Sequence, residues 1–252
     1  MGTHGSYEGG GGIPSFRRLV RLDAGKHVLV EKPLDVSVEA ASRVVDTARR
    51  SGLAAAVVSQ HRFDPASRAV HDALRRGRFG LPTSCVMSMP WWRDQAYYDM
   101  ADWRGTALLD GGALLNQAVH TVDLMTWFLG VPDEVFAWTA LLAHERIEVE
   151  DTAVAVVRFP SGALGVLHAT TAAYPGAGVR IQVHGDKGSA VIEDDRLVAL
   201  TTADRGDDGG SAGAPFRRPS TPSSPSTRTS SPRPVEGRAP LVDAMAGTQT
   251  SR

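Results

Sequence analysis

A carboxylate, an amine and a proline stand together in Glu31-Lys32-Pro33, directly after an apolar run. The run Val28-Leu29-Val30 predicts a short buried strand of a parallel sheet. Open α/β sheets bind ligands beyond the carboxyl ends of their strands, so the tripeptide stands where such folds place their chemistry. A surface Glu–Lys pair followed by a proline that ends the strand is the alternative from these residues alone.

A second set of polar residues lies in the segment Leu108–Gly130, where apolar residues recur at helical spacing after a glycine turn. Asn116, His120 and Asp123 fall at i, i+4 and i+7 and therefore share one face of the predicted helix. A histidine flanked by an amide and a carboxylate is a common arrangement for orienting an imidazole for proton transfer. A structural histidine with satisfied hydrogen bonds is the alternative for His120 taken alone.

The elements that would position the tripeptide form a βαβ unit. Residues 38–50 carry a helical apolar stripe with Ser37 as the N-cap, and residues 53–58 predict the next buried strand. Parallel strands end at the same edge of a sheet, so residues 60–62 should lie beside Lys32. Whether these three residues contact a ligand, or only cap and connect elements, stays open from the sequence.

Together these segments resemble the Gfo/Idh/MocA family of nicotinamide-dependent oxidoreductases, over about residues 21–200. The resemblance rests on three motifs in the same order: AGKHVLVEKPLDVSVEAA, HRFDPASRAVHDALRRGRFGLP and WRGTALLDGGALLNQAVHTVDL. It implies catalytic roles for Lys32, in the E-K-P motif, and for His120, in the later helix. The family's usual aspartate four residues before the histidine is Asn116 here. This resembles a subgroup that acts on sugars and nucleotide-linked sugars, in which Asn116 would orient substrate hydroxyls.

The resemblance also implies a cofactor, NAD or NADP. Glu31 would accept hydrogen bonds from its ribose hydroxyls, with Lys32 and Pro33 beside it. Trp103 and Arg104 precede the glycine turn, and the resemblance places Arg104 near the nicotinamide or the substrate. The aromatic residues of this segment either pack a loop by themselves or form a wall that stacks on a sugar ring. They are Trp91, Trp92, Tyr97, Tyr98 and Trp103.

From Thr83 onward, strands alternate with turns, which predicts a mostly antiparallel sheet covered by the long helix. The expected fold class is therefore α/β plus α+β. A partial Rossmann-type parallel sheet would occupy residues 1–62, and an open, mostly antiparallel substrate and dimerisation domain with a long helix residues 63–200. In the family the outer face of this sheet often pairs with a second subunit, which implies a homo-oligomer. The expected strands are 83–89, 134–142, 152–159, 163–171, 180–184 and 190–192.

Both ends of the chain depart from the family pattern. No G-x-G-x-x-G phosphate cradle is found, since the run Gly9–Gly12 has no apolar strand before it. The chain therefore looks like a family member truncated at its start. Residues 201–252 are rich in Pro, Ser, Thr and Arg and are expected to be disordered. An out-of-frame stretch in the gene would explain both ends.

Composition excludes several classes of protein. A formal charge of −1 over 252 residues argues against nucleic acid as a main partner. Cys85 is the only cysteine, and His144-Glu145 lacks the second histidine of an H-E-x-x-H site, so no metal site is expected. The sequence contains neither a long apolar span nor a signal peptide, which favours a cytoplasmic protein without a membrane partner.

The function expected is hydride transfer between a nicotinamide and a secondary alcohol of a sugar, cyclitol or sugar nucleotide. His120 would take the hydroxyl proton and Lys32 would hold the hydroxyl. The first alternative is a non-catalytic remnant or dimerisation module without a working cofactor site. The second is a nicotinamide-dependent glycosidase.

Overall fold

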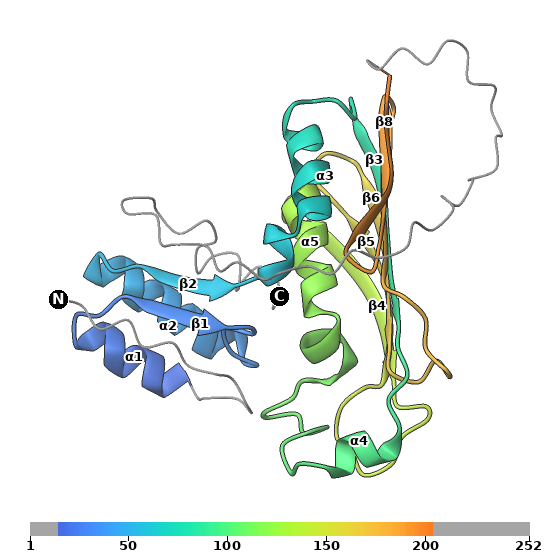
Figure 1. The fold of residues 1–252 in the computed structure, drawn as a ribbon. Coiled ribbons are helices and arrows are strands. Elements are labelled where there is room, and N and C mark those ends of the chain that lie inside the picture. Colours follow the sequence, from blue (N-terminus) through green and yellow to red (C-terminus); the bar gives the residue numbers. More distant parts are fainter. Residues whose placement is uncertain (1–14, 204–252) are drawn as a thin grey trace, which may run out of the picture.

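The computed structural model describes residues 15–203, which form two lobes (Figure 1). The smaller lobe contains α1 (Ser15–Asp23), β1 (Val28–Glu31), α2 (Val38–Ser51) and β2 (Ala55–Val58). The larger lobe is one sheet with helices on one side. The expectations for the glycine-rich leader and for nearly all of the tail concern residues outside the described part of the chain.

The smaller lobe is the predicted parallel unit. Strands β1 and β2 pair in parallel from Val28↔Ala55 to Glu31↔Val58, so both end at the same edge. The hydroxyl of Ser37 accepts a hydrogen bond from the Ala40 N–H at 3.3 Å, which confirms it as the N-cap of α2. Apolar side chains of β1, β2 and α2 form a separate core; among them are Val28, Val30, Val44, Val45 and Val57.

The two lobes are joined by a short 3₁₀ turn, η1 (Gln60–Phe63), and by α3 (Pro65–Arg75). Asp64 is the residue before α3 and Pro65 occupies the first turn, where the missing N–H of proline costs nothing.

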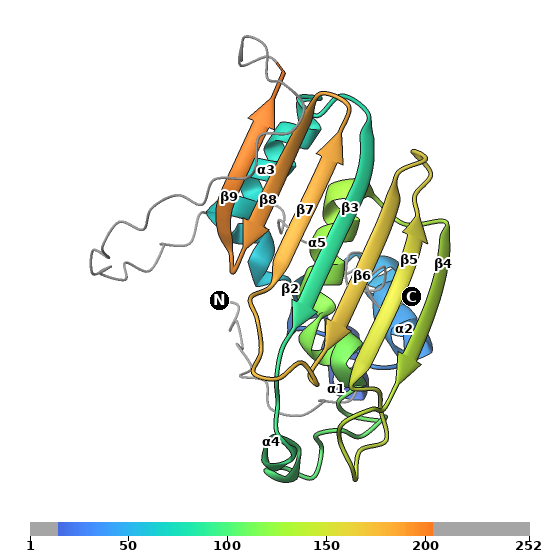
Figure 2. The ribbon, with the colours of Figure 1, turned by 90° about the vertical axis from the view of Figure 1, so that its right-hand side faces the viewer.

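The larger lobe is a seven-stranded sheet in the order β4-β5-β6-β3-β7-β8-β9 (Figure 2). Neighbouring strands are antiparallel except β3 and β6, which are parallel. All six expected strands are present, and β9 was not predicted. The strands are β3 (Pro82–Pro90), β4 (Glu134–Ala140), β5 (Thr152–Arg158), β6 (Leu164–Thr170), β7 (Arg180–Gly185), β8 (Gly188–Glu193) and β9 (Arg196–Thr202).

One face of the sheet is covered by α3 and α5 (Val119–Leu129), and the short helix α4 (Gln95–Asp99) lies beyond one end of the sheet. The main core lies between these helices and the sheet; its most deeply buried members include Val70, Phe79, Cys85, Met87, Phe159 and Val183. No helix crosses the opposite face of the sheet in the described residues (Figure 2). Among residues 15–203, no helix is both long and apolar enough to cross a membrane.

The expected long helix is divided into two parts. A π-helical turn, η2 (Ala113–Gln117), precedes α5, which begins at Val119. The carboxylate of Glu150 accepts a hydrogen bond from the Leu114 N–H at 3.0 Å, and the Ala113 N–H donates to the Glu150 carbonyl. The first turn is therefore tied to the β4–β5 connection, a tertiary contact that helical periodicity does not encode. Wide turns of this kind are frequent at functional sites.

Gly112 and Gly130 stand before and after this helical segment with nearly the same backbone angles, φ 84° and 92° with ψ −175° and −173°. Only glycine adopts this region readily, so Gly130→Ala should cost about 1–3 kcal/mol of unfolding free energy. A Cβ at Gly112 would also overlap a carboxylate oxygen of Glu150, whereas a Cβ at Gly130 would meet no atom within 4 Å. Gly112→Ala should therefore cost about 1 kcal/mol more, the value of the displaced Glu150 hydrogen bond.

Urea unfolding of both variants measures the difference. Equal losses of stability in the two variants would contradict the contact with Glu150.

Candidate functional site

The structure brings the two chemically suggestive segments into direct contact. The Lys32–Pro33 peptide bond is cis, at the end of β1. The amine of Lys32 donates to the backbone oxygen of Asn116 at 2.6 Å and to its side-chain Oδ1 at 3.3 Å. The half-buried amine of the smaller lobe thus lies against the π turn of the larger lobe.

Asp110 completes this polar chain and was not recognised from the sequence. The Asn116 side-chain amide donates to one carboxylate oxygen of Asp110, and the Gly105 N–H donates to the other at 2.7 Å. The carboxyl group is buried, at 3% exposure. Asp110 precedes the Gly111-Gly112 turn, outside the helical spacing that joined Asn116 to His120, so periodicity gave no sign of it.

Burial controls the charge of this pair. Desolvation lowers the pKa of the Lys32 amine, while the negative charges of Asp110 and Glu31 oppose that effect. Desolvation likewise raises the pKa of Asp110, against hydrogen bonds from Gly105 and Asn116 and the charge of Lys32. An amine in this setting is a strong electrostatic partner for an oxygen atom that gains negative charge.

His120 lies near the same junction, and its Nε2 is 3.3 Å from the side-chain nitrogen of Gln60. An amide N–H₂ can only donate, so Nε2 of His120 accepts and the ring proton lies on Nδ1. Burial, helped by the charges of Lys32 and His61, lowers the pKa of His120 to about 3. The imidazole is therefore neutral near pH 7 and has a lone pair available for a proton.

The residues after β2 contact α5, and a contact of these residues with a ligand stays a prediction. Gln60 bonds to His120, and the ring of His61 meets the ring of His120 edge-on at 4.8 Å. Arg62 donates two hydrogen bonds to Asp123, at 2.7 and 2.6 Å. The expected flanking of the imidazole by groups of its own helix is therefore wrong in one respect: its hydrogen bond comes from Gln60, and the Asp123 carboxylate binds Arg62.

Trp103 and Arg104 lie in a segment that packs largely on itself. The guanidinium of Arg104 lies 4.2 Å from the ring centre of Tyr97 and 5.5 Å from that of Trp103, and it donates to the Tyr97 carbonyl at 2.7 Å. Tyr97 also meets Tyr98 edge-on. These contacts favour the interpretation of a loop packed by its own aromatics. A substrate contact by Trp103 or Arg104 stays a prediction.

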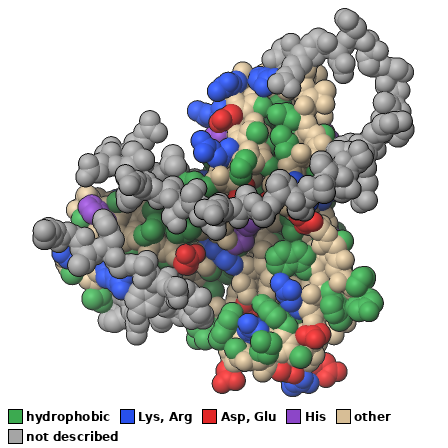
Figure 3. Space-filling model, in the orientation of Figure 1, with side chains coloured by type: hydrophobic (Ala, Val, Ile, Leu, Met, Phe, Trp, Pro, Cys, Tyr) green, Lys and Arg blue, Asp and Glu red, His purple; other side chains and the backbone are tan. Residues whose placement is uncertain are grey.

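The donor set at the junction fits the nicotinamide-ribose end of a dinucleotide. Glu31 is exposed at the carboxyl end of β1, so its carboxylate is available to accept from a ribose diol, and Pro33 lies half-buried beside it. The Lys32 amine and the neutral His120 supply a donor and a proton acceptor for an alcohol. In Figure 3, basic, acidic and histidine side chains lie where the two lobes meet.

Residues 19–59 match the model of an oxidoreductase family with an NAD-binding Rossmann fold, and residues 67–191 match that of the GFO/IDH/MocA C-terminal domain. The first match covers most of the smaller lobe and the second most of the larger lobe, so the two lobes that meet at the site correspond to the two domains of one family. The chain belongs to the GFO/IDH/MocA family of oxidoreductases, which confirms the resemblance found in the sequence and the expected fold class.

Two similar proteins are named as enzymes of a polyol and of an anhydro sugar. Myo-inositol 2-dehydrogenase of Thermotoga maritima is 31% identical over 75% of this chain and 55% of its own length. The 1,5-anhydro-D-fructose reductase of Ensifer adhaerens is 32% identical over 69% of this chain and 51% of its own. The chain thus spans about half the length of these relatives.

The WlbA dehydrogenase of Bordetella pertussis, solved with NADH and UDP-GlcNAcA, is similar in structure as well. It is 30% identical to this chain, with a TM-score of 0.77, over 94% of this chain and 70% of its own.

A histidine with the environment of His120 should stay neutral across the range in which a free histidine titrates. Its ring should bind a proton only as the pH falls toward about 3, rather than near 6.5 as in an unfolded chain. As the pH falls, the unfolded state binds the proton before the folded state does. The contribution of the neutral His120 to the free energy of unfolding is therefore complete above about pH 6.5 and is lost as the pH falls below that value.

Ring-nitrogen NMR of the labelled chain, with the His120 signals assigned by their absence in His120→Gln, measures this directly. A midpoint near that of a histidine-containing peptide would contradict the described environment.

Proposed function

We propose that this chain carries the catalytic residues of a nicotinamide-dependent oxidoreductase that acts on a secondary alcohol of a sugar, cyclitol or sugar nucleotide. The observation that carries the proposal is the junction itself. An amine, an amide and a neutral imidazole from two lobes converge at the carboxyl ends of parallel strands. Family membership supports the reaction class.

The roles of the residues follow from their hydrogen-bonding capacity. The Lys32 amine would hold the substrate hydroxyl and stabilise negative charge that develops on its oxygen. Nε2 of His120 would replace its hydrogen bond from Gln60 with one from that hydroxyl, and would accept the proton. When bound, NAD or NADP supplies the hydride acceptor at the carbon that carries this hydroxyl.

Asn116 gives the site its preference for polyhydroxylated substrates. Its side chain already accepts from Lys32 and donates to Asp110, so the amide is held in one orientation beside the amine. A neighbouring hydroxyl of a substrate could join this chain of hydrogen bonds, and it would be recognised without taking part in proton transfer. The inositol, anhydrofructose and nucleotide-sugar names of the relatives support this substrate class.

The rival function is a dimerisation module without a working cofactor site. NADH fluorescence on the purified chain separates the two. Enhancement of NADH emission, together with its loss in Glu31→Ala, supports the oxidoreductase. In a form that carries a complete dinucleotide-binding half, absence of NADH binding would contradict the proposal.

Substitutions at the junction should separate catalysis from substrate binding in such a form. His120→Ala should lower kcat by roughly 10²–10⁴-fold, the usual contribution of a positioned general base. Lys32→Ala should do at least comparable damage, because it removes charge stabilisation at the same oxygen. Asn116→Ala should raise KM more than it lowers kcat if the amide mainly holds substrate.

Steady-state kinetics with inositol and sugar substrates, at saturating cofactor, measure this pattern. An exposed substitution just before the start of β1, Lys26→Ala, is the control. Near-normal turnover in His120→Ala would rule out the proposed mechanism.

The open face of the large sheet is proposed to form a contact between two copies of the chain. Exposed apolar residues lie on neighbouring strands β4, β5 and β6, on the face that no helix covers (Figure 2). They pair laterally, for example Phe136 with Val156 and Val156 with Val166. An apolar area of this kind marks an interaction site. Its residues are Phe136, Trp138, Val154, Val156, Leu164 and Val166, between 40% and 69% exposed.

A single charge in the middle of this face should therefore separate the copies. Val156 and Val20 are almost equally exposed, at 51% and 49%, but Val20 lies on α1 of the smaller lobe. Val156→Asp should convert a dimer into a monomer because the pairing would bury its charge, whereas Val20→Asp should leave the dimer intact. Sedimentation velocity gives the masses. A monomeric unsubstituted chain would contradict the proposal.

A further inference from the structure

Three consecutive side chains of η1 attach the junction between the lobes to other elements. Gln60 contacts His120, and Arg62 binds Asp123 of the same helix. The pair of Arg62 and Asp123 is nearly buried, with side-chain exposures of 10% and 5%. The side chain between them, His61, has carboxylates on one side and the ring of His120 on the other.

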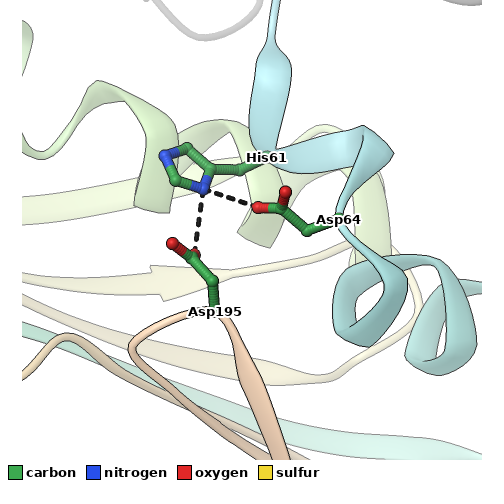
Figure 4. Close-up of side chains that lie close together, drawn as sticks. All are labelled: His61, Asp64 and Asp195. Carbon is green, nitrogen blue, oxygen red and sulfur yellow. Dashed lines mark hydrogen bonds and ion pairs between the residues drawn. The ribbon is translucent and has the colours of Figure 1, made fainter. Parts of the chain in front are cut away.

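His61 is held by two carboxylates that come from different parts of the chain. Its Nδ1 is 2.8 Å from Asp64 and 2.9 Å from Asp195 (Figure 4). Ionised carboxylates only accept hydrogen bonds, so Nδ1 carries the proton that they share. Asp64 is the N-cap residue of α3, yet its side chain makes no capping hydrogen bond. Its carboxylate binds His61 instead.

Asp195 reaches His61 from the far end of the sequence, at the turn between β8 and β9. The two residues of this turn, Asp194 and Asp195, have φ of 45° and 61°. Positive φ at both positions is the requirement of a tight hairpin turn, and Asp tolerates it better than most residues. Asp194 accepts a hydrogen bond from the Val179 N–H at 2.9 Å, which fixes the turn to the start of β7. The carboxylate of Asp195 therefore projects from a rigid support.

The other side of the His61 ring contacts the ring of His120. The two ring centres are 4.8 Å apart, at an interplanar angle of 63°. With Gln60 at Nε2 and His61 against the ring, two adjacent residues of η1 limit how the His120 imidazole can turn. Asp64 and Asp195 limit how His61 itself can turn.

We propose that His61, held by Asp64 and Asp195, is a positioning residue that keeps the His120 imidazole in the orientation in which Nε2 meets Gln60, so that the Gln60 donor selects one tautomer. The turn between β8 and β9 thereby helps to orient His120 through Asp195 and His61, without contacting substrate or cofactor in this role. The inference rests on the proposed function of His120, because the value of a fixed imidazole lies in its use as a proton acceptor.

The same three residues could instead hold a divalent cation, since their ligand atoms all lie within 4.8 Å of one another. The contact with His120 favours the positioning role, because a cation would not require it. The two possibilities differ in one measurable respect. A cation would displace the proton from Nδ1 of His61, whereas the positioning role requires that proton and no metal.

Asp195→Asn and His61→Phe are the informative variants. Asn tolerates the same positive φ and removes only the charge of Asp195. Phe retains a ring against His120 but has no N–H for the carboxylates. Arg196→Ala, an exposed substitution at the next position, is the control. The substituted ion pair is partly exposed, so each variant should keep the midpoint of thermal unfolding within about 3 °C.

Ring-nitrogen NMR of His120 near neutral pH reads the tautomer without any assay of activity. The unsubstituted chain and Arg196→Ala should show one protonated and one unprotonated ring nitrogen. In both informative variants the two nitrogen shifts should move toward each other as tautomers mix. Unchanged His120 signals in Asp195→Asn and His61→Phe would overturn the proposal.

Two further measurements separate the possible failures. Zinc or manganese that binds to the unsubstituted chain at micromolar concentration, and is lost in Asp195→Asn, would assign the three residues to a cation and overturn the positioning role. In a form with a complete dinucleotide-binding half, both variants should lower kcat by about 10-fold with KM unchanged. Normal kcat in His120→Ala would instead refute the proposed function, with the NMR result unaffected.

Discussion

The contact between the Lys32 amine and Asn116 is the interaction on which the site depends. It joins the end of a parallel strand in one lobe to a π-helical turn in the other, and each side needs the contact for a different reason. A half-buried amine requires acceptors, because a donor that is shielded from water and left unsatisfied is costly. The π-helical turn η2 supplies the backbone oxygen of Asn116 as an acceptor. The two lobes are therefore fixed to one another at the point where a substrate would bind.

The charges of the junction are balanced so that the imidazole stays neutral. Burial is the main cause of the lowered pKa of His120, and the charges of Lys32 and His61 add to its effect. The carboxylate of Asp110 offsets the amine, and the Asn116 amide separates the two by accepting from one and donating to the other. The substitution of asparagine for the family's aspartate removes one negative charge from this group. A second carboxylate beside Lys32 would raise the pKa of the amine. Its negative charge would also offset the effect of the amine on the pKa of His120.

The η1 turn explains how a two-lobed chain can hold such short distances. A flexible connection would allow the lobes to move independently, and the amine and imidazole would separate. Each of the residues 60–62 is bound to a partner in the larger lobe, two on α5 and one on the turn between β8 and β9. The connection is thus part of the larger lobe, although it continues directly from the strand of the smaller one.

The sequence alone determined the parallel unit, the start of α2 and six of the seven strands of the sheet, because periodicity, caps and turns are local properties of the chain. It also indicated Lys32, Asn116 and His120 as candidate site residues, through the E-K-P tripeptide, the shared helix face and the family resemblance. It did not reveal Asp110, Gln60 as the partner of the imidazole, or Asp195 beside His61. These contacts join residues far apart in the chain, and only the packing of one lobe and one hairpin against α5 decides which side chains meet. The division of the long helix has the same cause, since Glu150 binds its first turn from a distant loop.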